Sequence, residues 1–179
     1  MKTRSRKDAE RMSPESLSQL LEHLGSPDPA ARRAAAQSLP HLGDAVRAAA
    51  PALVDRAGDE DEAVQTAVTE TLENLGPPDL AALPALIERL TSSSADVAYW
   101  AATLIGRLEA DAAPATTALA DALVNHSGLN ARERAAWALG KIGPRAGGAR
   151  AALTAAASAP SPRLSRLAQE SLKRLGGNA

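Results

Sequence analysis

The chain has 179 residues, of which 45% are apolar, 2% are aromatic and 23% are charged, and its formal net charge is −1. Cysteine is absent, which excludes disulfides, thiolate chemistry and cysteine-based metal sites. No run of about eighteen apolar residues occurs, which argues against a membrane span, and the polar start of the chain is unlike a secretory signal. We therefore expect a cytoplasmic protein that does not enter membranes.

The apolar residues are mainly 42 alanines and 24 leucines, and phenylalanine is absent. Alanine and leucine are strong helix formers, whereas the aromatic and β-branched residues typical of strands are scarce. The composition therefore predicts an all-α protein.

After a basic tail over residues 1–13, which we expect to be flexible, one pattern recurs five times. It is a pair of Leu or Ile residues three positions apart, followed in four cases by glycine. The first members of the pairs, spaced 33, 33, 34 and 33 residues apart, are Leu39, Leu72, Ile105, Leu139 and Leu172. Such a period is typical of a repeat array, in which neighbouring repeats cover the apolar face of each unit. The pattern predicts one domain with repeats at about 14–43, 44–76, 79–109, 111–143 and 147–176.

Each repeat is expected to hold two antiparallel helices, which gives ten helices in all. If the residue eight before each periodic Leu or Ile is position 0, then positions 0, 4, 8 and 11 form one apolar stripe on the second helix. The N-cap residues predicted three positions earlier are Asp28, Asp61, Ser94, Gly128 and Ser161. In the fourth repeat Asn130 and Glu133 offer a competing capping box. Pro51 and Pro84 predict a bent first helix in repeats two and three.

The segments 31–43 and 131–143 resemble the second helix of HEAT repeats, in particular the short HEAT-like repeats of phycobilisome lyases. The signatures of ankyrin and tetratricopeptide repeats, which have similar periods, are missing. The resemblance covers residues 14–176 and implies an elongated, monomeric α-solenoid of about five HEAT-like helix pairs. It also implies that the outward positions of the second helices line a concave binding surface.

Those outward positions, numbers 2, 6, 9 and 10, carry two aromatic residues on adjacent repeats, Tyr99 and Trp137. Aromatic and cationic side chains together are typical of binding hot spots. The candidate partner-binding residues are Tyr99, Trp100, Arg107, Arg134, Trp137 and Lys141. The alternative is that Trp100 packs as core between repeats three and four and that Trp137 folds over the same junction.

We expect no catalytic residue, metal site or cofactor. His23, His41 and His126 lie at non-equivalent positions and lack metal-ligand spacing. The acidic run at residues 59–62 falls at a predicted helix start, which indicates helix capping and solvation, with a cation site as the alternative.

The favoured function is a non-catalytic scaffold that binds another protein, one with an acidic surface, through the concave face. One alternative is an enzyme of the HEAT-like lyase or DNA glycosylase type, which would stack a tetrapyrrole or nucleobase on the aromatic residues and for which Glu133 is the central candidate carboxylate. Another is nucleic-acid binding through residues 91–179, which hold ten basic and six acidic side chains. The near-neutral chain argues against nucleic acid, and residues 51–90 hold nine acidic and only two basic side chains.

Overall fold

A computed structural model describes residues 14–177 of the chain, and this part is helical without strands. The basic tail predicted for residues 1–13 lies outside it. The α-helices are α1 (Pro14–Leu24), α2 (Pro29–Ser38), α3 (Ala50–Arg56), α4 (Glu62–Asn74), α5 (Leu83–Arg89), α6 (Ala95–Arg107), α7 (Thr116–Asn125), α8 (Leu129–Ile142), α9 (Arg150–Ala156) and α10 (Pro162–Leu175). The 3₁₀ helices are η1 (Leu39–Ala49), η2 (Leu80–Ala82), η3 (Glu109–Ala115) and η4 (Gly143–Ala149).

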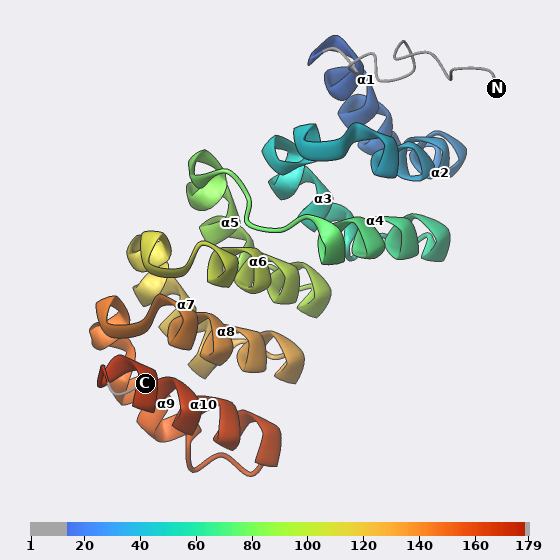
Figure 1. Ribbon diagram of the computed structural model, residues 1–179. Helices are drawn as coiled ribbons and strands as arrows, with labels where there is room; N and C mark the ends of the chain where they lie inside the picture. The colour runs from blue at the N-terminus through green and yellow to red at the C-terminus, as the bar shows by residue number, and fades with distance from the viewer. Residues whose placement is uncertain (1–13, 178–179) are drawn as a thin grey trace, which may run out of the picture.

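The helices form two layers. Helices α2, α4, α6, α8 and α10, the second helices of the five pairs, follow one another along one side of the molecule, and the odd-numbered helices lie along the other side (Figure 1). This arrangement confirms the all-α solenoid of five helix pairs. Across residues 14–177, every helix is too short or too polar to pass through a bilayer.

The core follows the predicted stripe on the second helices. Positions 0, 4, 8 and 11 are buried in every repeat except at Ala31, Leu108 and Leu172, which are half-buried. Because the period of a helix keeps these positions on one face, each second helix covers its first helix with the same stripe.

The five predicted N-caps are confirmed. Asp28, Asp61, Ser94 and Ser161 each accept a backbone N–H bond within the first turn, whereas Gly128 caps α8 without a side chain. The competing capping box in repeat four does not form, because α8 begins at Leu129 and the Glu133 carboxylate binds Arg163 instead.

The glycines after the periodic pairs allow the chain to turn out of the second helix. Gly43, Gly76 and Gly143 have φ values of 54°, 72° and 69°, which side chains other than glycine rarely adopt. Repeat three lacks this glycine, and Glu109 takes the conformation with φ 51°. In the last repeat the left-handed residue is Gly177, one position later than the glycine in the sequence pattern.

The prolines of repeats two and three begin an α-helix rather than bend one. Pro51 and Pro84 are each the second residue of α3 and α5, where a missing N–H breaks no helical hydrogen bond, and the preceding segment is the 3₁₀ helix η1 or η2. The predicted bend is therefore a change from 3₁₀ to α-helix.

The residue after each periodic Leu or Ile, at position 9, controls how closely consecutive second helices approach. The prediction that position 9 faces outward is wrong in repeats three and four, where this residue is buried against the next second helix. In repeats three and four this residue is Gly106 or Gly140, and a Cβ there would lie 3.1 Å from backbone Cα atoms of the next second helix, at Ala138 and Ser171 respectively. In repeat two it is Glu73. Accordingly α6 packs closely on α8 and α8 on α10, whereas α4 and α6 meet less extensively.

Leu72 provides a test of this core, because it lies in α4 with no exposed surface. Leu72→Ala should reduce the free energy of unfolding by about 2–5 kcal/mol, since the lost side chain leaves a cavity between packed helices. Denaturant unfolding followed by circular dichroism measures the loss. Leu172→Ala, at the equivalent position of the last repeat, should reduce the free energy of unfolding less, because Leu172 is only half-buried. Equal losses at the two positions would contradict this description of the core.

Candidate functional site

The structure gathers all six predicted partner-binding residues around one groove of about 490 Å³ on the layer of second helices. Tyr99, Trp100 and Arg107 come from α6, and Arg134, Trp137 and Lys141 come from α8. The other lining residues are Glu73, Gly76, Pro77, Thr103 and Glu109. We call this space the aromatic groove. It extends from the end of α4, where the second helices are less closely packed, onto α8.

The three aromatic residues are not equally exposed. Trp100 is 7% exposed and belongs to the hydrophobic core, whereas Tyr99 and Trp137 are half-buried. The Tyr99 and Trp100 rings meet edge to face with centroids 5.4 Å apart and planes at 87°, an arrangement that aromatic quadrupoles favour. The core alternative is thus correct for Trp100, which still forms part of the groove floor.

Trp137 is held in place by the close approach of α6 and α8. Its ring covers Gly106 so tightly that a Cβ on that glycine would lie 2.9 Å from Cε3 of the indole. The indole therefore needs a glycine beneath it.

Arg134 lies between the two half-buried rings. Its guanidinium carbon is 4.6 Å from the Tyr99 ring centroid and 5.1 Å from that of Trp137, and one of its N–H groups donates to the Tyr99 hydroxyl. Among residues 14–177 these are its polar and ring partners, and none is a carboxylate. The rings orient the cation without neutralising it.

Arg107 is engaged within the chain. Its guanidinium donates to the carbonyl oxygens of Leu72, Glu73 and Gly76 at 2.6, 3.2 and 3.4 Å, and so caps the C-terminus of α4. Burial, followed by the nearby charge of Arg134, lowers the pKa of Arg107. Arg107 thus joins repeats two and three, and most of its donors are already engaged.

Lys141 is also paired. Its ammonium group donates to a Glu109 carboxylate oxygen at 2.7 Å, and this hydrogen bond and charge lower the pKa of Glu109. Glu109 was not among the predicted site residues. Its position, where the other four repeats have glycine, was the signal in the sequence that could have drawn attention to it.

A smaller hollow of about 150 Å³ lies on the other side of Trp137 and is lined in part by Glu133. The Glu133 side chain is 10% exposed, forms an ion pair with Arg163 at 3.2 Å and accepts from the Ser161 hydroxyl at 3.5 Å. It therefore links α8 to the start of α10, although helix periodicity predicted an outward position. The candidate carboxylate of the enzyme alternative is already bound by these partners.

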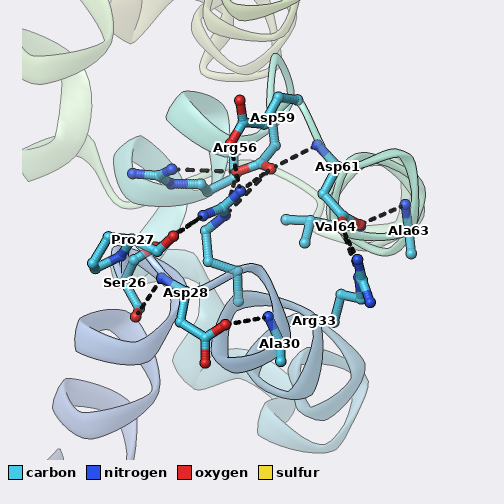
Figure 2. Close-up of polar contacts among 12 residues, drawn as sticks. Ser26, Pro27, Asp28, Ala30, Arg33, Arg56, Asp59, Asp61, Ala63 and Val64 are labelled. Carbon is cyan, nitrogen blue, oxygen red and sulfur yellow. Dashed lines mark hydrogen bonds and ion pairs between the residues drawn. The ribbon is translucent and has the colours of Figure 1, made fainter.

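The acidic run at residues 59–62 connects repeats one and two (Figure 2). The Asp59 carboxylate, 1% exposed, contacts Arg32 at 3.0 Å and Arg56 at 3.3 Å. Asp61 caps α4 and binds Arg33 at 2.7 Å. Capping is therefore confirmed, but the expectation of a solvated run is wrong for Asp59. Three arginines occupy the place of the proposed cation, and no metal-binding cluster of His, Asp or Glu occurs within residues 14–177.

The charge state of Asp59 follows from these contacts. Burial raises the pKa of its carboxyl, but hydrogen bonds from the Asp61 N–H, Arg32 and Arg56 outweigh burial, so the pKa is lowered. A lowered folded-state pKa contributes stability that is present above the ordinary aspartate pKa of about 4 and is lost as pH falls through the folded-state value.

Asp59→Asn should therefore lower the melting temperature at neutral pH and should make it less sensitive to acid below about pH 4 than that of wild type. Thermal unfolding across this pH range gives both values. Glu60→Gln is the matched control, because Glu60 binds the same Arg32 but is 84% exposed, and should change little. An Asp59→Asn protein that loses as much stability in acid as wild type would show that another group is responsible.

Gly106→Ala should displace Trp137, since the new methyl group would overlap its ring. The expected result is greater quenching of tryptophan fluorescence by acrylamide with helicity retained, because the core Trp100 contributes little accessible fluorescence. Gly147→Ala is the control, since a Cβ at Gly147 meets no atom within 4 Å. Unchanged quenching in Gly106→Ala would contradict the fixed position of Trp137.

Comparison with known proteins agrees with this architecture. No curated protein matches the chain. Among solved structures, the chain is similar to an engineered protein, at 20% identity and a TM-score of 0.59, with 92% of this chain and 81% of that chain covered. It is also similar to a designed armadillo repeat protein in complex with the peptide (KR)4, at 19% identity and a TM-score of 0.57, with coverage of 90% and 82%.

A third similar structure is the complex of CpcE and CpcF of phycocyanin lyase from Nostoc sp. PCC7120, at 25% identity and a TM-score of 0.58, with 99% of this chain and 70% of that chain covered. The family model for HEAT repeats matches residues 14–106 and 83–173. Because these matches span almost all of the described residues, the chain belongs to the HEAT-repeat family.

Proposed function

We propose that this protein is a non-catalytic scaffold that binds another protein through the aromatic groove. The observation that carries the proposal is the arrangement of Arg134 between Tyr99 and Trp137, with no carboxylate partner among residues 14–177. Half-buried aromatic side chains beside an oriented arginine are the residue types that dominate protein interfaces.

The groove favours a partner with an acidic surface. Lys141 already has a carboxylate partner, and most of the Arg107 donors bind backbone carbonyl oxygens, so Arg134 is the groove cation that we expect a partner carboxylate to meet. A guanidinium held by two rings loses little further freedom when it binds a carboxylate. Of the three cations in the predicted site, we therefore expect Arg134 to bind the carboxylate of the partner directly.

A protein ligand agrees with the architecture better than a small substrate does. The designed armadillo repeat protein that this chain resembles is in complex with the peptide (KR)4, which supports a peptide or protein ligand for a solenoid of this kind, although that peptide is basic. The lyase complex from Nostoc supports the enzyme alternative by likeness alone. Within the groove, Glu73 lies near Arg107 and Glu109 pairs with Lys141. In the smaller hollow, Glu133 pairs with Arg163.

We further propose that the protein acts as a monomer in the cytoplasm.

Variants of the two half-buried aromatic residues test the proposal. Partners captured from a lysate of the source organism are compared between immobilised wild type, Tyr99→Ala, Trp137→Ala and Thr66→Ala. A true partner should bind wild type and Thr66→Ala, whose site is the exposed equivalent of Tyr99 on α4. It should lose about 2 kcal/mol of binding free energy, or about thirtyfold in affinity, with each aromatic variant.

Circular dichroism and melting curves of the same variants separate binding from folding. Helicity and melting temperature should stay close to those of wild type. If both aromatic variants unfold, the rings are core residues, and if both bind normally, the interface lies elsewhere.

A further inference from the structure

A second hollow, of about 590 Å³, lies one repeat before the aromatic groove. It is lined by Leu39, Pro40, Gly43, Val46, Arg47, Glu70, Thr71, Asn74 and Leu75. With the 33-residue period, Gly43 and Asn74 in this hollow correspond to Gly76 and Arg107 in the aromatic groove. The two hollows are thus the same place on successive repeats, and a ligand that follows the second-helix layer would meet both.

The charge of the equivalent side chains changes between the two places. Where the aromatic groove has Arg107, which caps the end of α4, the second hollow has the neutral Asn74. The Asn74 side chain donates to the Glu70 carbonyl oxygen of its own helix at 2.8 Å. Thr103 in the aromatic groove corresponds to Glu70 in the second hollow. Helix α4 as a whole carries three glutamates and no basic residue, so its exposed face is acidic, although Arg47 also lines the hollow.

Glu70 lacks the partners that several other acidic residues of this part of the chain have. The carboxylates of Asp59 and Asp61 are bound by arginines (Figure 2), and the charge of Glu73 acts on the nearby Arg107, although burial lowers the pKa of that arginine overall. Glu70 is exposed and forms no ion pair within residues 14–177. Among the residues that line the two hollows, Glu70 on α4 therefore presents an anion without an ion pair, and Arg134 on α8 presents a cation without a carboxylate partner.

We propose that the two hollows together bind one extended segment of the partner that carries both signs of charge. An acidic side chain of the segment lies on Arg134 between the two rings, and a basic side chain lies in the hollow beside Glu70. This inference rests on the proposed function and adds the order of charges along the ligand. Complementary charges at two separate places fix the direction in which such a segment binds.

Synthetic peptides of equal length with one shared tyrosine-containing core test the proposal by fluorescence polarisation on the full chain. One peptide is acidic, one is basic, and two carry an acidic block at one end and a basic block at the other, in opposite orders. One order of the mixed peptide should bind about three- to fivefold more tightly than the acidic peptide, which is the gain expected of an exposed ion pair.

Glu70→Gln should abolish that gain and leave the affinity for the acidic peptide unchanged. Glu88→Gln, the same change at an exposed position of α5 in the other layer, should alter neither affinity. Arg134→Gln should weaken the acidic peptide and both mixed peptides. Circular dichroism of each variant checks that the fold is retained.

The contrary outcomes separate the inference from the proposed function. If the acidic peptide binds but neither mixed order binds more tightly, the second hollow takes no part and only the inference fails. If the gain survives Glu70→Gln, the basic block binds elsewhere and the inference fails as well. If the basic peptide binds best, or if no peptide binds, both the inference and the proposed acid-binding groove are wrong.

Discussion

The close approach of consecutive second helices is the constraint on which the rest of the structure depends. Two helices can come together to backbone contact only where the facing residue lacks a side chain, and Gly106 and Gly140 provide this on α6 and α8. Glu73 occupies the same position on α4, and there the helices meet less extensively. A single residue type at one repeated position thus divides the solenoid into a tightly packed C-terminal part and a looser junction between repeats two and three.

The looser junction explains why the aromatic groove is where it is. At the end of α4 the long side chain of Arg107 reaches the C-terminal carbonyl groups of the helix from the next repeat. The tight packing of α6 on α8 in turn orients Trp137 against Gly106. The groove is therefore open on the α4 side and rigid on the α8 side, a combination suited to binding with little loss of side-chain freedom.

The sequence predicted those features that depend on one helix at a time. The period located the five helix pairs, the residues before each second helix located its N-cap, and helix geometry placed Tyr99, Arg134 and Trp137 around one groove. The partners of charged side chains were not predictable in this way. Asp59, Arg107 and Glu133 find partners on neighbouring repeats, and such pairing depends on the offset between repeats, which the pattern of a single helix does not contain. A charge that looks solvated on its own helix can therefore be a link between repeats.

This division between linking charges and uncompensated charges gives the electrostatic character of the second-helix layer. Several charged side chains that line the two hollows are engaged within the chain, through the ion pair of Lys141 with Glu109 and the carbonyl cap of Arg107. The charges of Lys141 and Glu109 largely cancel at a distance, whereas Arg107 keeps its positive charge, because carbonyl oxygens are neutral acceptors. An approaching partner therefore meets negative charge at Glu70 on α4 and positive charge at Arg107 on α6 and Arg134 on α8. Net charge alone, near zero for the chain, would have concealed this polarity, since it arises from which charges are paired rather than from how many there are.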